Sequence, residues 1–203
     1  MEPYTTIAAP AAFELVEKKS RFIAEARPVA DREAFAAFLA EIRARHYKAR
    51  HNTYAYALRG EFKYSDDGEP QGTAGFPIHG VIKARGLSNV AVIVTRYFGG
   101  VLLGAPGLVR AYSAAAAGAL SSSSVVTQRP HTVAEISVAY DMYDKVRRET
   151  LRRGVLILGS DFAASVVIHA AAPEGFDAYA TALNELTGGA IHVNIIGVEY
   201  IDD

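Results

Sequence analysis

The sequence contains no cysteine among its 203 residues. This absence excludes a disulfide framework, a cysteine nucleophile and cysteine-ligated zinc. No apolar run reaches the roughly 20 residues that a bilayer-spanning helix needs. The opening stretch, "MEPYTTIAAPAAFELVEKKS", starts acidic and lacks the basic region and apolar core of a signal peptide. We therefore expect a soluble, cytoplasmic protein that does not associate with membranes.

Motifs for nucleophilic or metal-assisted catalysis are also missing. The chain has no G-x-S-x-G or H-E-x-x-H sequence, and His46 and His51 are five residues apart, outside the i,i+4 spacing of a helical metal pair. An isolated histidine is more often structural than catalytic. The isolated histidines here are His79, His131, His169 and His192. These absences imply no cofactor and favour a non-enzymatic protein, without deciding whether any catalytic activity exists.

The charges that are present divide unevenly along the chain. Residues 1–129 hold 16 Lys and Arg against 11 Asp and Glu, whereas residues 130–203 hold 5 against 11. A serine run and a proline in "LSSSSVVTQRPH" separate the two parts. With half of its residues hydrophobic, the chain can form two cores. We predict one domain over 1–129 and a second over 130–203.

The second part has a regular pattern of predicted elements. A strand over 131–140 precedes a helix over 141–154, with Asp141 as its cap and Gly154 at its end. Two strands over 155–170, around a turn at Gly159–Asp161, precede a helix over 173–189 and a last strand over 190–201. This βαββαβ order predicts a ferredoxin-like α+β domain.

The first part is less regular. One or two strands are expected over 13–30, followed by a helix over 31–46 with Asp31 as cap. Its buried face is expected to contain Phe35, Phe38, Leu39 and Ile42. The remaining expected elements are a strand over 52–58, a long loop over 63–77, a helix over 77–86, a strand over 88–96 and a helix over 106–120.

Glycines concentrate between the last of these strands and the last helix, in "RYFGGVLLGAPG". Free N–H groups of Gly99, Gly100 and Gly104, next to a helix N-terminus and to Arg96, could bind a phosphate. The spacing matches neither G-x-x-x-x-G-K-[ST] nor G-x-G-x-x-G, and glycine also serves where φ must be positive. Spacing alone favours a sharp turn and leaves the anion site as the alternative.

Two other stretches have residues suited to binding. "SDDGEP" places Asp66, Asp67 and Glu69 around a glycine, which suits either a weak metal site or, more simply, a solvated acidic turn. "RARHYKARHNTYAYALR" interleaves cations with aromatic rings, as a nucleic-acid surface would. The candidates there are Arg45, Lys48, Arg50, Tyr54, Tyr56 and Arg59. The alternative is a solvated helix end and a strand whose tyrosines face the core.

Five blocks together resemble the IMPACT family, in its bacterial two-domain YigZ-type branch. The blocks span most of residues 15–120 and read "KKSRFIA", "ARHNTYAY", "SDDGEPQGTAG", "TRYFGG" and "GLVRAY". The resemblance implies a first domain like the second domain of a small-subunit ribosomal protein, also found as domain IV of elongation factor G. It implies a second domain like a C-terminal domain of that factor. Two positions in the glycine loop depart from the usual family pattern, Leu102 for a lysine and Pro106 for a glycine, and both weaken an anion site.

These likenesses imply an RNA or ribosome partner and a translation-related regulatory role, by analogy of fold. Arg96 and Arg110 join the expected nucleic-acid-binding residues. Two alternatives stay open. One is a small-molecule enzyme or binder that holds a phosphorylated ligand between the glycine loop and the "SDDGE" carboxylates, and the other is a protein–protein adaptor. The sequence does not indicate the oligomeric state.

Overall fold

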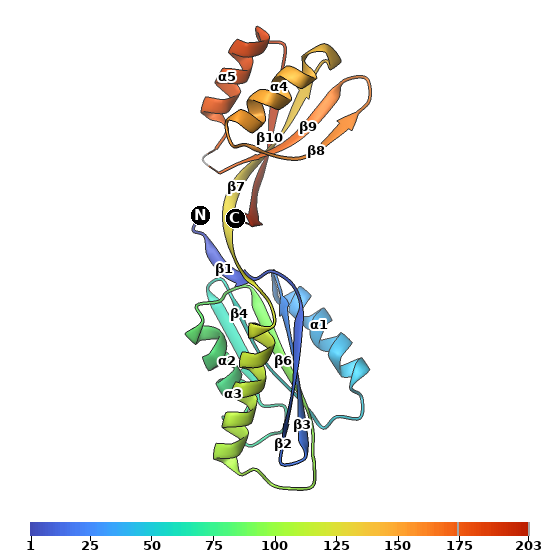
Figure 1. The fold of residues 1–203 in the computed structure, drawn as a ribbon, viewed down its shortest axis with the longest axis vertical. Helices are drawn as coiled ribbons and strands as arrows, with labels where there is room; N and C mark the ends of the chain where they lie inside the picture. The colour runs from blue at the N-terminus through green and yellow to red at the C-terminus, as the bar shows by residue number, and fades with distance from the viewer. Residues whose placement is uncertain (174, 203) are drawn as a thin grey trace. The chain divides into compact units, whose positions relative to one another are not determined.

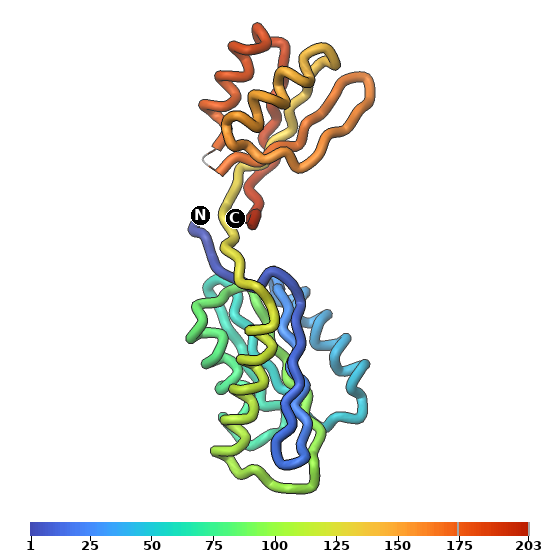
Figure 2. Tube along the Cα trace, viewed as in Figure 1, coloured from blue at the N-terminus to red at the C-terminus, as the bar shows by residue number. Residues whose placement is uncertain are grey.

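A computed structural model of the chain describes residues 1–173 and 175–202. The chain forms two compact units, one of residues 4–127 and one that runs from Gln128 onward and includes Met1–Pro3. The sequence predicts a boundary near residue 129, and in the structure the division falls between Thr127 and Gln128. The first unit combines β-strands with three helices, and the second combines four strands with two helices; Figures 1 and 2 show the course of the chain through both.

The first unit is built on a five-stranded sheet in the order β2-β3-β6-β4-β5, in which all neighbouring strands are antiparallel. Helices α2 and α3 cover one face of the sheet and α1 covers the other (Figure 1). Its elements are β1 (Tyr4–Ile7), β2 (Ala11–Glu17), β3 (Ser20–Pro28), α1 (Arg32–Arg45), β4 (His51–Leu58), β5 (Glu61–Ser65), α2 (Gly75–Ala84), β6 (Val90–Tyr97) and α3 (Ala105–Ser121).

Central strand β6 explains the two-layered core of this unit. Val90, Val92 and Val94 pack toward α2 and α3, whereas Ala91 and Ile93 pack toward α1. Alternate residues of a strand point to opposite faces, so a strand with both faces covered is apolar throughout. The apolar run over Val90–Val94 has this cause.

Helix α1 forms as its sequence predicts. The Asp31 carboxylate accepts a hydrogen bond from the Ala34 amide at 2.8 Å, and Phe35, Phe38 and Ile42 are buried. The loop expected over 63–77 is shorter in the structure, because β5 continues to Ser65 and α2 begins at Gly75. Propensity gives little sign of this short edge strand, which is held by pairing with β4.

The second unit has the βαββαβ order predicted from its sequence. Its sheet runs β10-β7-β9-β8 with antiparallel neighbours, and α4 and α5 cover one face (Figure 1). The elements are β7 (Val125–Val138), α4 (Tyr140–Arg152), β8 (Leu156–Phe162), β9 (Val166–Ala172), α5 (Asp177–Thr187) and β10 (His192–Asp202). Strand β7 begins before the division between the units.

Two local predictions in this unit were wrong. The N-cap of α4 is Ala139, without a side-chain hydrogen bond, and Asp141 lies in the first turn of the helix. The strand β8 continues through Gly159–Asp161 with a register shift, and the chain turns after Phe162, where the Ala163 amide donates to the Ser165 carbonyl at 3.0 Å. Glycine within a strand often marks such an irregularity rather than a turn.

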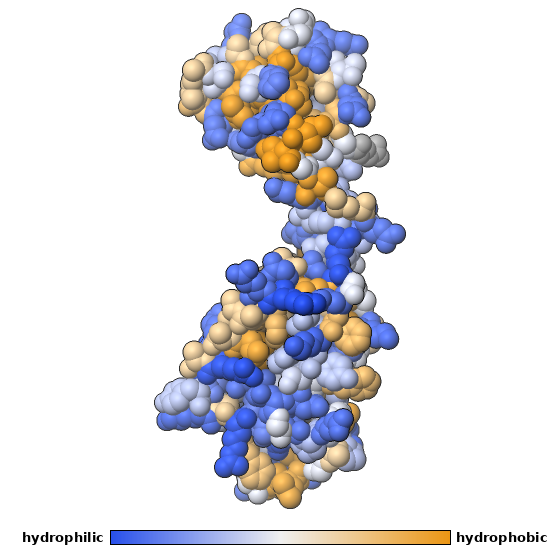
Figure 3. Space-filling view, turned by 180° about the vertical axis from the view of Figure 1, so that it is seen from behind, coloured by the Kyte–Doolittle hydropathy of each residue, from blue (hydrophilic) through white to orange (hydrophobic). Residues whose placement is uncertain are grey.

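Large apolar side chains stay exposed on the strands of the second unit, because helices cover only one face of its sheet. Figure 3 shows hydrophobic surface on the side of this unit that faces the viewer. The exposed residues of β8 and β10 include Leu156, Leu158, Ile195, Ile196 and Val198. Across the described residues, none of the helices has both the length and the apolar character for a bilayer crossing.

Candidate functional site

The sequence blocks that carry the family resemblance meet at one end of the first unit. Strand pairing places Arg21 opposite Tyr97 and His51 opposite Arg96, so the start of β3, the start of β4 and the end of β6 share one end of the sheet. In Figure 2 the dark-blue hairpin between β2 and β3 lies beside the yellow-green loop that precedes α3. We call this region, formed by residues 18–20, 46–51, 66–74 and 96–110, the motif end.

A buried ion pair lies at the centre of the motif end. The Arg96 guanidinium donates through Nη1 to Glu69 Oε1 at 2.7 Å, and both side chains are over nine-tenths buried. The Tyr112 hydroxyl donates to the same carboxylate oxygen at 2.7 Å. Burial and this hydrogen bond raise the pKa of Tyr112, so the phenol remains a donor. Arg96 also lies over the rings of Phe22 and Phe98, at 5.3 and 5.6 Å from their centroids.

The two aspartates of the acidic loop are used for internal structure. Asp66 accepts hydrogen bonds from the amides of Gly72, Ala74 and Gly75 at 2.8 to 3.0 Å, and so caps the N-terminus of α2. Asp67 accepts from the Asn52 amide at 2.7 Å and from Arg43 at 3.1 Å. The loop is thereby joined to α2, β4 and α1.

These contacts oppose a metal site in the acidic loop. Asp66, Asp67 and Glu69 point to three different sets of donors and do not converge on one point. Within the ranges 1–173 and 175–202, no group of three or more His, Cys, Asp or Glu side chains is arranged to hold a metal ion. The alternative function that used these carboxylates on a phosphorylated ligand loses its acidic groups.

The glycine loop packs against the β2–β3 hairpin. A Cβ on Gly99 would lie 2.0 Å from the carbonyl carbon of Lys19, and the Gly99 amide donates to Ser20 Oγ at 3.1 Å. Gly100 and Gly104 have φ values of +85° and +72°, which side chains disfavour. The local structure thus requires or favours glycine at each of these three positions. Arg96 is buried against Glu69, so it does not supply the exposed cation that the anion-site hypothesis expected beside the loop.

The cations of the basic stretch, residues 43–59, differ in whether they form ion pairs. Arg45 forms ion pairs with Glu25 and Glu41, and Arg43 pairs with Asp67. Lys48 and Arg50 are exposed and take part in no ion pair among the described residues, although Lys48 lies near the ring of Tyr47. Arg59 is exposed and lies over the ring of Tyr4.

Tyr54 and Tyr56 of the same stretch face α1. Both rings contact Phe35, with centroid separations of 4.9 and 4.5 Å, and Tyr56 is 4% exposed. Its hydroxyl donates to Glu61. These positions match the interpretation in which the tyrosines belong to the core. Tyr54, Tyr56 and Arg96 therefore do not form part of an exposed basic surface.

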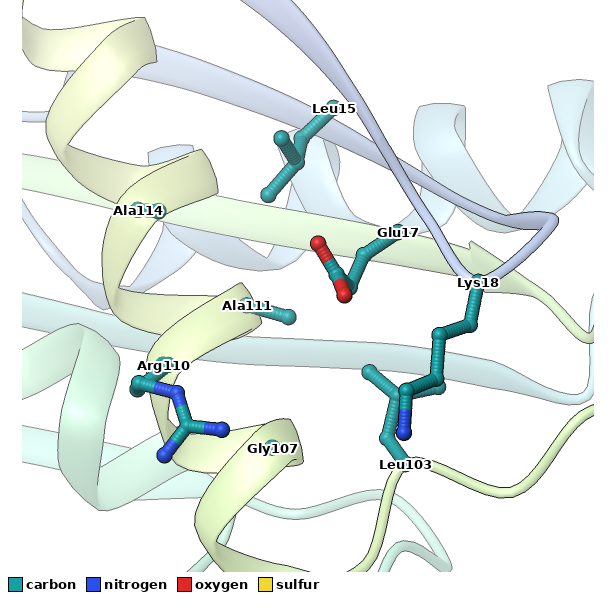
Figure 4. A pocket seen from close by; sticks show the side chains of 8 residues that line it. All are labelled: Leu15, Glu17, Lys18, Leu103, Gly107, Arg110, Ala111 and Ala114. Carbon is teal, nitrogen blue, oxygen red and sulfur yellow. The ribbon is translucent and has the colours of Figure 1, made fainter.

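A pocket of about 280 Å³ opens beside the motif end, between β2 and α3. Figure 4 shows Lys18 and Glu17 extending from the hairpin and Arg110 from α3, around a floor of Leu15, Gly107 and Ala111. Arg110 was expected as a binding residue, but sequence reasoning missed Lys18 and Lys19 as candidates. The paired lysines in "KKSRFIA" were the available signal. Both have positive φ, +45° and +65°, which is uncommon for residues with a side chain.

Comparison with known proteins assigns the family. A model of the Impact N-terminal domain matches residues 18–120, and a model of a domain of unknown function, DUF1949, matches residues 136–190. The chain belongs to the IMPACT family. Its domain arrangement is that of the YigZ-type members.

Several IMPACT family relatives are similar over most of their length. The chain is 32% identical to YvyE of Bacillus subtilis over all of this chain and 95% of that protein. It is 34% identical to YigZ of Escherichia coli over 85% of this chain and 87% of that protein. A Thermus thermophilus family member, named for the 5' region of pol, is 52% identical over 51% of this chain and 56% of that protein.

A solved structure also matches along the whole chain. A crystal structure described as that of a hypothetical protein superposes with a TM-score of 0.66 and 32% identity, and the match covers 97% of this chain and 98% of that one. The two-domain α+β architecture is therefore shared with an experimentally determined relative.

Proposed function

We propose that this chain is a non-enzymatic protein of translation regulation that binds RNA, free or within the ribosome, through the motif end. The observation that supports this proposal is the division of charge there. The three carboxylates of the acidic loop form hydrogen bonds and ion pairs within the protein. Lys18, Lys19, Lys48, Arg50 and Arg110, in contrast, take part in no ion pair among the residues that the structure describes.

Exposed rings accompany these cations. Tyr47 is 75% exposed and Phe98 is 55% exposed. Proteins that bind single strands combine cations along the backbone with rings on which bases stack, and the motif end offers both kinds of group. Arg45 belongs to the proposed surface at its margin, since it is shared with two carboxylates. Arg59 follows β4 at the opposite end of that strand, in the β4–β5 turn, and does not belong to this surface.

The proposed domain likenesses agree with such a role. We propose that the first unit resembles the second domain of a small-subunit ribosomal protein and domain IV of elongation factor G. We also propose that the second unit is ferredoxin-like, and its βαββαβ order with strand order β10-β7-β9-β8 supports this. Both likenesses concern proteins that work on the ribosome, and the support is by analogy of fold.

The test is the salt dependence of binding to a labelled single-stranded RNA, measured by fluorescence anisotropy. We expect Lys18→Ala/Arg110→Ala to weaken binding and to reduce the slope of log K against log salt by about 1.4, for two lost phosphate contacts. A second double variant, Lys48→Ala/Arg50→Ala, tests the other side of the motif end in the same way.

The matched control is Arg147→Ala/Arg148→Ala, which removes two exposed cations from α4 in the second unit. It should bind RNA as the parent does. Equal losses in the control and in the motif-end variants would show that binding follows only net charge. Unchanged binding in both motif-end variants would remove the proposal.

A second candidate function rests on the pocket between β2 and α3. Its volume suits a small phosphorylated ligand, and Arg110 and Lys18, which outnumber the single carboxylate of Glu17 in its lining, would bind the phosphate. Calorimetric titration with inorganic phosphate and with a nucleoside monophosphate tests this. Saturable binding that Arg110→Ala abolishes, in a protein that shows no RNA binding, would favour the small-ligand function.

A further inference from the structure

A group of aromatic rings lies on the edge of the first unit, on β5 and α2. Phe62, Tyr64 and Phe76 are 59%, 40% and 56% exposed, whereas His79 beneath them is 9% exposed. The Phe62 ring stacks on the His79 ring with centroids 4.2 Å apart, and Tyr64 meets Phe76 edge to face at 5.7 Å. We call Phe62, Tyr64, Phe76 and His79 the aromatic edge. The proposed RNA surface does not use these residues.

A pocket of about 390 Å³ adjoins the aromatic edge. It is lined on the apolar side by Leu58, Phe62 and Leu87, with His79 and Lys83 in its wall. Glu61 also lines it, and its charge is paired with Arg32. His79 is more than nine-tenths buried as a residue, and its ring nitrogens, which keep contact with solvent, make no hydrogen bond to the described residues. Burial, with the charge of Lys83 adding to it, lowers the pKa of His79. The imidazole is therefore neutral at pH 7 and offers a ligand one donor and one acceptor.

The strand that carries Phe62 and Tyr64 also has an open edge. Strand β5 is the last in the order β2-β3-β6-β4-β5 and pairs with β4 alone among the described strands. Natural edge strands are usually blunted by charge, proline or a bulge, because exposed N–H and C=O groups accept another strand. The charged residues of β5 are Glu61 and Lys63. They alternate with Phe62 and Tyr64 along the strand, so they point toward the opposite face of the sheet from the two rings.

We propose that β5 and its pocket bind an extended, acidic segment of a partner protein. The segment adds as a further strand to β5, places one large apolar side chain in the pocket beside Phe62 and His79, and brings acidic side chains to Lys63 and Lys83. Strand addition obtains affinity from backbone hydrogen bonds and specificity from pockets that receive alternate side chains.

Charge favours an acidic partner segment over two other possible occupants of β5, a second copy of the chain and RNA. Lys63 and Lys83 take part in no ion pair within the described ranges, so an acidic segment complements them. A second copy of the chain that paired β5 with itself over its full length would place Lys63 opposite Lys63, which is unfavourable. RNA requires more cations than these two, and the pocket lining also includes the carboxylate of Glu61.

The experiment uses the full chain and short acetylated peptides, followed by amide chemical shifts. The probe is a threonine peptide with a central phenylalanine and glutamate at the first and second positions on either side of it, because Lys63 and Lys83 lie toward opposite faces of β5. We expect saturable shifts at Phe62, Tyr64, His79 and Leu87. The same peptide with lysine in place of glutamate should bind about fivefold more weakly or worse, and a peptide with proline on either side of the phenylalanine should not bind, because it cannot pair as a strand.

Three variants make the result specific. Phe62→Ala should abolish binding of the probe, and Lys83→Glu should reverse the preference between the acidic and basic peptides. The matched control is Phe98→Ala, which removes a ring of nearly equal exposure from the motif end and should leave peptide binding unchanged. RNA binding is measured on the same three proteins and is expected to change only in Phe98→Ala, so failure here is distinguishable from failure of the RNA proposal.

Several outcomes would overturn the inference. One is the absence of shifts at β5 with millimolar probe. Another is dilution-dependent shifts of the same amides without peptide, which would identify a second copy as the occupant. A third is a larger response of the aromatic edge to single-stranded RNA than to the peptide.

Discussion

At the scale of single residues, the Glu69–Arg96 pair has the largest energetic consequence. Removing one member of a buried ion pair leaves the other charge uncompensated, which costs about 3 to 5 kcal/mol. We therefore expect Glu69→Gln to destabilise the protein by about this amount in urea unfolding. Tyr112→Phe should cost less, about 1.5 to 3 kcal/mol, because the carboxylate keeps Arg96 as its partner.

An exposed pair provides the control for that experiment. Glu14 accepts two hydrogen bonds from Arg21 on the surface of the first unit. Glu14→Gln should leave the free energy of unfolding nearly unchanged, because solvent screens such pairs. If Glu69→Gln proved as mild as Glu14→Gln, the ion pair would not be the element that holds the acidic loop to β6.

The neighbouring glycines of the motif end should respond to substitution for different reasons. Alanine at Gly100 meets open space but must adopt a φ of +85°, at a cost of about 1 to 2 kcal/mol. Alanine at Gly99 would place its Cβ within 2.4 Å of three backbone atoms of Lys19 and Ser20, so the hairpin must move.

We expect Gly99→Ala to lower thermal stability more than Gly100→Ala and to shift the amide signals of Lys19 and Ser20. Gly60→Ala serves as a control for positive φ, since Gly60 has φ +86° and open space but lies away from the motif end, in the β4–β5 turn. A greater loss in Gly100→Ala than in Gly99→Ala would contradict the close-packing explanation.

At the scale of elements, helix α2 should make stability depend on pH through His79. The folded state keeps the pKa of His79 below its ordinary value of 6.5, so the unfolded chain binds a proton at this residue more readily. The contribution of His79 to the free energy of unfolding is therefore complete above pH 6.5 and decreases as the pH falls below that value.

Urea unfolding of the parent and of His79→Gln, at several pH values between 5 and 8, measures this contribution. The parent should lose stability on acidification more steeply than the variant. His192, which is exposed on β10, provides the control, because His192→Gln should leave the slope of the parent unchanged. Parallel slopes for the parent and His79→Gln would show that His79 is not desolvated in solution.

At the scale of the whole molecule, each unit contains its own hydrophobic core. The core of the second unit joins β7 and β9 to α4 and α5, and its fully buried residues include Ile136, Val146, Ile168 and Leu183. We expect residues 128–203, expressed alone, to unfold cooperatively and to give a dispersed amide spectrum. The fragment keeps the pairing of β10 with β7 up to Gln128, although it loses the exposed hydrogen bond from Tyr200 to the Glu2 carbonyl. A spectrum typical of a disordered chain would show that this core is insufficient.

The sequence by itself determined most elements and the family of this protein. Helix α1 and the βαββαβ order of the second unit follow from local periodicity, since a helix or strand with one face on a core repeats its apolar residues every 3.6 or 2 positions. Strand β6 follows from an uninterrupted apolar run, because both of its faces are covered. The motif blocks identified the IMPACT family because each block is a contiguous stretch of chain that can be read without the fold.

Only the tertiary structure decided what the polar residues of those blocks do. Glu69 and Arg96 are 27 residues apart, and Glu69 and Tyr112 are 43 apart, so no local pattern indicates that they form one buried cluster. The same holds for the steric need for glycine at position 99, which depends on a hairpin 80 residues earlier in the chain. Hydrophobic periodicity is a property of neighbours in sequence, whereas hydrogen bonds, ion pairs and close approaches depend on which strands the folded sheet places side by side. Only the three-dimensional structure therefore showed which charged residues of the motif end form internal ion pairs and which remain available for binding.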